Sequence, residues 1–312
     1  MQVIRHLQDG HAPKGTVLVL GNFACVHRGH RALLSDAKRI AVERQAPLAV
    51  MVFEPHPQEF FRPESEPLRV TSFHKRAEEF EALGVDLLVV LAFDAALAGM
   101  SAQDFVLDVL VAKLGVVHVV VGQDFRFGQK RAGDVTALSY MGDVEGFGVT
   151  AYRPVAADGA EKISSSAIRN ALRAGRPEEA ARLLGHWWSV DGHVAHGDAR
   201  GRTIGFPTAN LKLDGLFTPA FGVYAARVTL EDGCRCNAVA NFGKRPTVGG
   251  ETPLLEVHLF DFAGDLYGKR ISVEFISYIR PEQKFSGLEA LKAQIAKDCD
   301  AAGGILSRIS SV

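Results

Sequence analysis

The stretch Thr16 to His30, TVLVLGNFACVHRGH, decides the fold of the first half of the chain. Its first part, residues 16–23, is a short β-rich run. The apolar residues that follow the stretch recur at helical spacing: Leu33, Ala37, Ile40 and Ala41. The loop between them carries neither G-x-x-x-x-G-K-[ST] nor G-x-G-x-x-G, the two familiar phosphate-binding patterns. The stretch therefore predicts a strand that leads into a helix through a loop of another kind.

Two histidines lie at this strand-to-helix junction. His27 and His30 are three residues apart, so they would share one side of the first helical turn. The unpaired N–H groups of a helix N-terminus already favour an anion there. Two imidazoles at that place could hydrogen-bond the α-phosphate of ATP and stabilise the charge that develops as pyrophosphate departs. The alternative is that both are capping or partly buried polar side chains.

The rest of the first half alternates apolar runs with amphipathic helical stretches. Ser101 and Asp104 begin one helix, which Gly115 stops. The further strands are predicted at residues 48–53, 85–91, 116–121 and 148–152. Strands that alternate with helices in this way predict a doubly wound parallel sheet with helices on its faces.

The pattern changes after two further helical stretches, residues 166–173 and 177–184. From Trp188 onward the apolar residues tend to alternate, which predicts antiparallel β structure in a small barrel or sandwich. The clearest alternating runs are residues 223–228, 255–259 and 271–275. We therefore predict two domains, residues 1–185 and 186–312, with His186, Trp187 and Trp188 as an interdomain packing cluster.

A terminal helix is predicted near the end of the chain. Ser286 and Glu289 form a possible capping box at its start. Leu288, Leu291 and Ile295 then make one apolar stripe.

Composition bounds the class of protein. A chain of 312 residues with 47% hydrophobic residues is long enough for two cores, and its formal net charge of -1 argues against a dedicated nucleic-acid binder. No signal peptide or bilayer-spanning run is visible, so we expect a soluble cytoplasmic protein without a membrane partner. The 4 cysteines are scattered, which argues against a disulfide framework. No metal other than Mg²⁺ is suggested.

A Gly-rich loop in the second half, residues 196–210, suits a nucleotide phosphate. Its backbone N–H groups and arginine side chains supply donors for phosphate oxygens. The Thr208 hydroxyl and the Asn210 amide oxygen could help coordinate Mg²⁺, which prefers oxygen ligands. The alternative is a Gly-rich turn with its arginines in solvent. The candidate phosphate-binding residues of the loop are Gly201, Arg202, Gly205, Thr208 and Asn210.

Several separated blocks of the second half resemble the riboflavin kinase module of bacterial bifunctional riboflavin kinase/FMN adenylyltransferases, also called FAD synthetases. The blocks are GRTIGFPTANL from Gly201, GVY from Gly222, NFGKRPTV from Asn241 and LEVHLFDFAGDLYGKRI from Leu255. The resemblance implies a six-stranded barrel with a terminal helix. It also implies that Thr208 and Asn210 contribute to Mg-ATP binding and that Glu256 is the base that activates the 5′-hydroxyl of riboflavin.

The first half resembles the adenylyltransferase module of the same family, which has a sheet of nucleotidyltransferase type. The matching pattern is G-N-F-x-x-V-H-x-G-H, which implies nucleotide handling by Gly21, Asn22, Phe23, His27, Gly29 and His30. Residues 162–169, KISSSAIR, resemble an element that holds ATP phosphates through Ser164, Ser165 and Arg169. Residues 122–128, GQDFRFG, resemble a loop that faces FMN or ATP through Asp124, Phe125, Arg126 and Phe127.

The resemblance implies two reactions: riboflavin and ATP give FMN and ADP, and FMN and ATP then give FAD and pyrophosphate. One departure affects the second reaction, because Ala24 and Cys25 stand where the family usually has aspartate and glycine. An alternative is therefore a riboflavin kinase whose adenylyltransferase domain is impaired. A non-enzymatic flavin sensor, or a related nucleotidyltransferase fused to a barrel, would also fit parts of the pattern.

Overall fold

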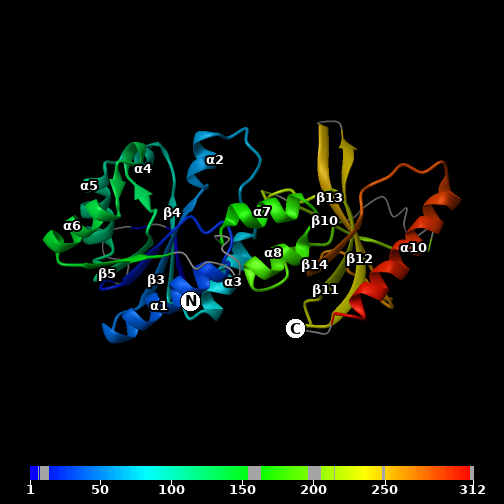
Figure 1. The fold of residues 1–312 in the computed structure, drawn as a ribbon, viewed down its shortest axis with the longest axis horizontal. Coiled ribbons are helices and arrows are strands. Elements are labelled where there is room, and N and C mark those ends of the chain that lie inside the picture. The colour runs from blue at the N-terminus through cyan, green and yellow to red at the C-terminus, as the bar shows by residue number, and fades with distance from the viewer. Residues whose placement is uncertain are drawn as a thin grey trace. The chain divides into compact units, whose positions relative to one another are not determined.

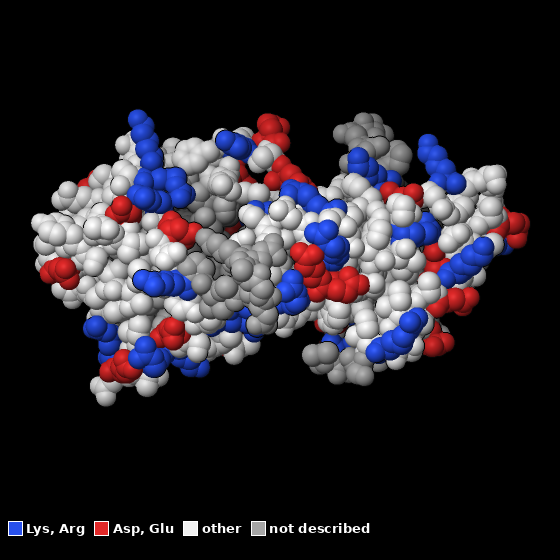
Figure 2. All heavy atoms as spheres, in the orientation of Figure 1, with Lys and Arg blue, Asp and Glu red and all other residues white. Residues whose placement is uncertain are grey.

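The computed structural model describes residues 1–5, 7, 14–153, 163–195, 205–213, 215–247 and 250–309, although not the side chains of residues 245–247 and 250–252. The chain forms two compact units (Figure 1). The first unit comprises Met1–Leu68 and Phe73–Ser165, and the second comprises Arg69–Ser72 and Ser166–Val312. On the face drawn in Figure 2, positive and negative side chains are interspersed, in line with the net charge near zero.

A six-stranded sheet forms the centre of the first unit. All of its strand pairs are parallel, and their spatial order is β1-β4-β3-β2-β5-β8. The strands are β1 (Gln2–Ile4), β2 (Val17–Leu20), β3 (Leu48–Glu54), β4 (Leu87–Ala92), β5 (His118–Gly122) and β8 (Gly148–Tyr152). The predicted doubly wound sheet is confirmed for the described residues.

Helices cover both faces of this sheet because alternate strand residues point to opposite sides. Val17 and Val19 join a core with α1 (Arg28–Glu43) and α3 (Phe73–Ala82). Leu18 and Leu20 join a second core with the π-helical segment η1 (Phe105–Lys113) and α6 (Val135–Glu145). Shorter elements connect these: α2 (Pro57–Phe61), α4 (Ala95–Gly99), α5 (Ala102–Asp104), β6 (Arg126–Phe127), η2 (Gln129–Arg131) and β7 (Gly133–Asp134).

Two parts of this unit were not predicted from the sequence. The edge strand β1 is short and contains only one buried residue, Ile4, so its pattern carries no signal. The hairpin of β6 and β7 is held by cross-strand pairing between Arg126 and Asp134 and between Phe127 and Gly133. The predicted start of a helix at Ser101 is confirmed, since the Ser101 hydroxyl accepts the Asp104 N–H at 3.0 Å.

The second unit contains a six-stranded antiparallel sheet in the order β10-β13-β12-β11-β14-β9. Its strands are β9 (Ser189–His193), β10 (Ala209–Lys212), β11 (Gly222–Thr229), β12 (Arg235–Thr247), β13 (Gly250–Leu259) and β14 (Arg270–Arg280). An isolated bridge joins Ala195, just after β9, to Asn210 of β10. Because this bridge connects the two edge strands, the sheet is a nearly closed barrel, as the resemblance implied.

The terminal helix α10 (Leu288–Leu306) packs on the outside of the barrel against β11, β12 and β14. Its predicted start is wrong, because the N-cap is Gly287 and no side chain caps the helix. The predicted apolar stripe is confirmed only in part, since Leu291 and Ile295 are half-buried but Leu288 is exposed, and the fully buried residues are Asp298, Ala302 and Leu306. The Asp298 carboxylate accepts two hydrogen bonds from Arg280 at 2.9 and 2.6 Å, so an ion pair fixes the inner face.

Helices α7 (Ser165–Arg173) and α8 (Pro177–Leu184) pack with the second unit from Ser166 onward. This division lies earlier in the chain than the domain border at residue 185, which stays a prediction. Trp188 is buried in the second unit, where its Nε1–H donates to the Val70 carbonyl at 2.7 Å and its ring lies 4.6 Å from that of Phe275. Trp187 packs on the core beneath α10, so both tryptophans have a packing role.

Candidate functional site

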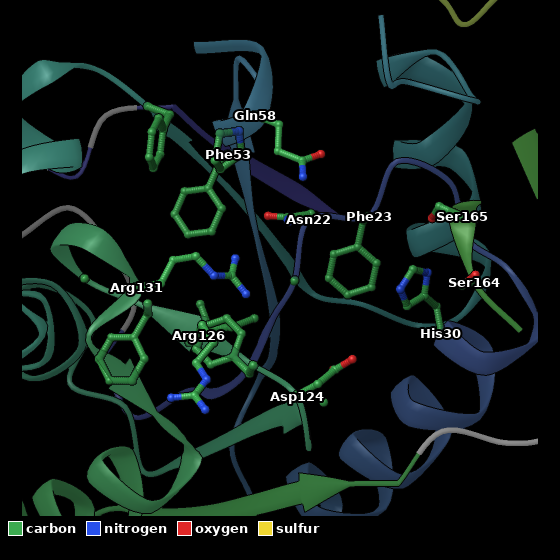
Figure 3. Close-up of a pocket in the computed structure, with 18 of the residues that line it drawn as sticks. Asn22, Phe23, His30, Phe53, Gln58, Asp124, Arg126, Arg131, Ser164 and Ser165 are labelled. Carbon is green, nitrogen blue, oxygen red and sulfur yellow. The ribbon is translucent and has the colours of Figure 1, made fainter. Parts of the chain in front are cut away.

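A pocket of about 750 Å³ opens in the first unit, at the carboxyl ends of the parallel strands (Figure 3). Open parallel sheets generally bind their ligands at this edge. The strand-end residues that line the pocket are Gly21, Phe53, Phe93, Gly122 and Tyr152. The pocket volume is in the upper part of the range for small-molecule sites. One end of the pocket is polar and the other is aromatic.

The polar end is built around the two histidines. His27 is the N-cap of α1, and its Nδ1 accepts the backbone N–H of His30 at 3.2 Å. The two imidazole rings are stacked, with centroids 3.6 Å apart and planes inclined by 11°. Gly29 packs closely on His27, since a Cβ there would lie 3.2 Å from His27 Nδ1. The sequence therefore placed both rings on the same side of the helix start, as expected.

Hydrogen bonds fix a different tautomer for each ring. His30 Nδ1 lies 2.9 Å from the Cys25 carbonyl, which can only accept, so Nδ1 of His30 carries the proton. His27 Nδ1 accepts a proton from the backbone, so its Nε2 carries the proton in the neutral ring. Burial lowers the pKa of His27 to about 4. Burial, together with the proximity of His27, also lowers the pKa of His30 well below its usual value.

The low pKa of His27 makes the first unit sensitive to acid. The unfolded chain takes up a proton at His27 below about pH 6.5, whereas the folded chain does so only near pH 4, so stability is lost as the pH falls between these values. By pH 5 this costs about 2 kcal/mol relative to pH 7. We expect the His27→Asn variant, which keeps a capping side chain but does not titrate, to escape this loss.

Native-state hydrogen exchange of the β2 amides at pH 7 and pH 5 measures this effect, because β2 lies in the core of the same unit. Wild-type protein should lose about 2 kcal/mol more protection free energy than His27→Asn. Equal losses would show that His27 titrates with an ordinary pKa.

The loop of Gly21, Asn22 and Phe23 lies beside the histidines and lines the pocket. Phe23 has a φ of 39°, and its ring lies 4.5 Å from His30. The buried Arg76 of α3 holds this loop, since it donates to the Phe23 carbonyl at 2.9 Å and to the Glu54 carboxylate at 2.5 Å. A partly buried charge pair therefore joins the first loop to the end of β3, which sequence reasoning did not predict.

Ser164 and Ser165 line the pocket on the side of the histidines. The Ser165 hydroxyl lies 3.6 Å from Cys25 Sγ, so the residue that departs from the family pattern contacts a candidate phosphate ligand. Ala24 and Cys25 are both buried, and neither has a positive φ. The side chain of Cys25 is therefore accommodated without backbone strain, although the family usually has glycine there.

The aromatic end brings together residues from β3, α2, β4 and the loop after β5. Asp124, Phe125, Arg126 and Phe127 line the pocket, and their contact with flavin or nucleotide stays a prediction. The sequence did not predict several further lining residues, because their places in the pocket depend on long-range packing rather than on a local motif. These are Gln58, Phe61, Phe93, Leu97, Met100, Lys130 and Arg131.

The second candidate site lies on the barrel. Asn210 of β10 and Asn241 of β12 are both directly opposite Glu256 of β13. Opposite residues of antiparallel strands point to the same face with Cβ atoms about 5 Å apart, so the three polar side chains form a row. Leu255, the neighbour of Glu256, is fully buried in the barrel core. The row therefore faces away from that core, and Asn241 is an addition to the predicted residues.

A hydrogen bond from β13 also helps to position Thr208. His258 Nδ1 donates to the carbonyl of Pro207 at 2.8 Å, which ties the residue before Thr208 to β13. A small cavity of about 70 Å³ lies beside Thr208 and is also lined by Phe262, Asp265 and Tyr267.

Four candidate phosphate ligands need separate mention. Gly201 and Arg202 lie outside the described residues, whereas Gly205 is described and is exposed. Arg169 lies on α7, where its guanidinium donates to the Ser166 hydroxyl at 3.0 Å. The role of Arg169 stays a prediction.

Comparison with known proteins decides the family. Residues 9–167 match the family model described as FAD synthetase, and residues 184–306 match the one described as riboflavin kinase. The chain is 44% identical over 300 residues to the bifunctional riboflavin kinase/FMN adenylyltransferase of Escherichia coli K12, covering 96% of each chain. The chain belongs to this family.

Further bifunctional riboflavin kinase/FMN adenylyltransferases are similar over most of their length. The Bacillus subtilis enzyme is 39% identical over 288 residues, covering 91% of this chain and 90% of its own. A solved structure from Streptococcus pneumoniae, titled a macrolide-efflux protein, is 33% identical with a TM-score of 0.85, covering 96% and 98% of the two chains. This similarity indicates that both units have the same fold as the corresponding parts of that structure. Among the described residues, no helix combines the length and apolar character needed to cross a membrane.

Proposed function

We propose that the chain makes FAD from riboflavin in two ATP-dependent steps. The barrel phosphorylates riboflavin to FMN and releases ADP. The first unit then adenylylates FMN to FAD and releases pyrophosphate. The observation that carries the proposal is the match of both family models to one chain, with a candidate site in each unit. The kinase-only alternative is not favoured, because full-length relatives at 35–44% identity are named as bifunctional enzymes.

In the adenylylation step, a phosphate oxygen of FMN attacks the α-phosphorus of ATP as the bond to the β-phosphate oxygen breaks. The FMN phosphate is already anionic, so no strong base is needed. His27 donates its Nε2–H to the α-phosphate and stabilises the developing charge. His30 first takes up a proton at Nε2, which the anionic nucleotide favours, and then donates as well. Ser164, Ser165 and Arg169 hold the remaining phosphates.

In the phosphorylation step, Glu256 accepts the proton of the riboflavin 5′-hydroxyl while the oxygen attacks the γ-phosphorus of ATP. The neighbouring Asn210 and Asn241 can orient the carboxylate from both sides of the row. Gly201, Arg202 and Gly205 contribute donors to the phosphates of the nucleotide.

Mg²⁺ fits the same place. The Thr208 hydroxyl and the buried Asn210 amide offer hard oxygen ligands next to a carboxylate. In the parts of the chain that the structure describes, no three His, Cys, Asp or Glu residues form a metal-binding cluster. This suits an ion that is held mainly by nucleotide phosphates and waters. An ion held there would neutralise phosphate charge during transfer.

A chromatographic time course tests both steps. Purified protein with Mg-ATP is supplied either with riboflavin or with FMN, and both flavin products are followed. We expect FMN and then FAD from riboflavin, and FAD from FMN. If riboflavin gave FMN but neither substrate gave FAD, only the barrel would be active. That result would overturn the proposal for the first unit.

A further inference from the structure

The turn that closes the hairpin of β6 and β7 carries two cations in an unusual backbone conformation. Lys130 has φ 53° and ψ 22°, and Arg131 has φ 59°. Residues with a Cβ rarely adopt this left-handed region, and two in succession are rarer still. Such conformations cluster at ligand sites, where the surrounding structure enforces them.

The surrounding structure fixes this turn against the aromatic end of the pocket. The N–H of Gln129 donates to the Met100 carbonyl at 2.8 Å. Gly128 packs so closely on Ala102 that a Cβ would lie 2.6 Å from the Ala102 nitrogen. Lys130 and Arg131 therefore line the pocket at a constrained position. Figure 3 shows the Arg131 side chain extending from this turn into the pocket beside Phe53.

The charge of these two residues is not used within the described structure. Three cations line the aromatic end of the pocket: Arg126, Lys130 and Arg131. Arg126 forms an ion pair with Asp134 at 3.2 Å. Among the described residues, the side chains of Lys130 and Arg131 have neither an ion-pair partner nor a hydrogen-bond partner. Their donors are therefore available to a ligand.

We propose that Arg131, supported by Lys130, recognises the carbonyl edge of the isoalloxazine ring of FMN. Phe53, Phe61 and Phe93 offer apolar surfaces to an aromatic ring at this end of the pocket. The phosphates are assigned to the opposite, histidine end, so the polar atoms that remain for Arg131 are the ring carbonyl oxygens. A guanidinium N–H donates a charge-assisted hydrogen bond to one such carbonyl oxygen. The inference rests on the proposed adenylylation of FMN.

The Arg131→Ala variant tests this contact. Loss of a charge-assisted hydrogen bond should raise the KM for FMN about tenfold while changing kcat and the KM for ATP less than about twofold. Arg131→Lys keeps the positive charge but loses the guanidinium donors, so its KM for FMN should rise less than that of Arg131→Ala. Lys130→Ala should also give a smaller rise in the KM for FMN. Arg39→Ala, an exposed cation paired with Glu43 on α1, is the matched control. The unchanged kcat and KM for ATP report that the first unit of the variant is folded.

Flavin analogues locate the contact on the ring. In 2-thio-FMN and 4-thio-FMN a sulfur replaces one carbonyl oxygen and accepts hydrogen bonds poorly. We expect at least one analogue to have a severalfold higher KM with wild-type protein, and Arg131→Ala to be insensitive to that replacement. An unchanged KM for FMN in Arg131→Ala would overturn the proposal. So would full sensitivity to both analogues in that variant, or a rise confined to the KM for ATP.

The proposed adenylylation can fail separately from this inference. If wild-type protein made no FAD, equilibrium binding of FMN, followed by flavin fluorescence, would still compare wild type with Arg131→Ala. Weaker binding in the variant would support the contact, and equal binding would overturn it.

Discussion

The Glu256→Gln variant is expected to lose riboflavin phosphorylation by a factor of about 100 or more, the usual range for removal of a general base. Glutamine keeps the size of the side chain and its place between Asn210 and Asn241, but it cannot accept the proton of the riboflavin hydroxyl. FMN adenylylation should survive, because its proposed residues lie in the other unit. Separate assays of FMN formed from riboflavin and FAD formed from FMN measure both effects.

Glu274→Gln is the matched control for this prediction. Glu274 lies on β14 of the same barrel and faces Arg235 at 3.4 Å. Its replacement should leave phosphorylation nearly unchanged. Equal loss of both activities in a folded Glu256→Gln variant would count against the division of labour between the units. Full phosphorylation would show that Glu256 is only a strand carboxylate in solvent.

The second large effect is expected at His27. The His27→Asn variant keeps a side chain that can cap α1, but it removes the Nε2–H that we assign to the α-phosphate. Removal of one donor that stabilises transition-state charge typically costs a factor of about 100 to 1000 in kcat. We expect FAD formation to fall by this factor and riboflavin phosphorylation to stay near the wild-type rate.

His74→Asn serves as the control for a surface histidine of the same unit, since His74 on α3 pairs with Glu78 at 3.0 Å. It should keep both activities. Normal FAD formation by His27→Asn would remove His27 from the mechanism and leave it as a helix cap. Parallel loss of kinase activity would indicate misfolding instead.

Much of the fold and of both sites was predictable because the relevant contacts are local. A strand followed by a helix places His27 and His30 within one helical turn, and this follows from their spacing alone. The alternation of strands and helices predicted the parallel sheet, the change to period two predicted antiparallel β structure in a barrel or sandwich, and the family resemblance implied the barrel. Glu256, Thr208 and Asn210 came from blocks of sequence that resemble one family, which the comparisons confirmed.

Features that depend on long-range pairing were not predictable. The buried stripe of α10 runs through Asp298, a residue that an apolar pattern excludes, because Arg280 of β14 neutralises it. Strand β1 belongs to the sheet because it pairs with β4, which lies far along the chain. Arg76 holds the Phe23 loop through a hydrogen bond between residues that are far apart in the sequence.

The sequence by itself determined the alternation of strands and helices in the first half and the change to antiparallel β structure in the second, and it supplied the candidate residues within each motif. These depend on neighbours within a few positions, where spacing fixes geometry. Only the tertiary structure decided which distant residues lie beside the candidate site residues: Asn241 opposite Glu256, and Arg131 at the aromatic end of the pocket. The reason is that strand register and loop packing bring together residues whose separation in sequence carries no signal of contact.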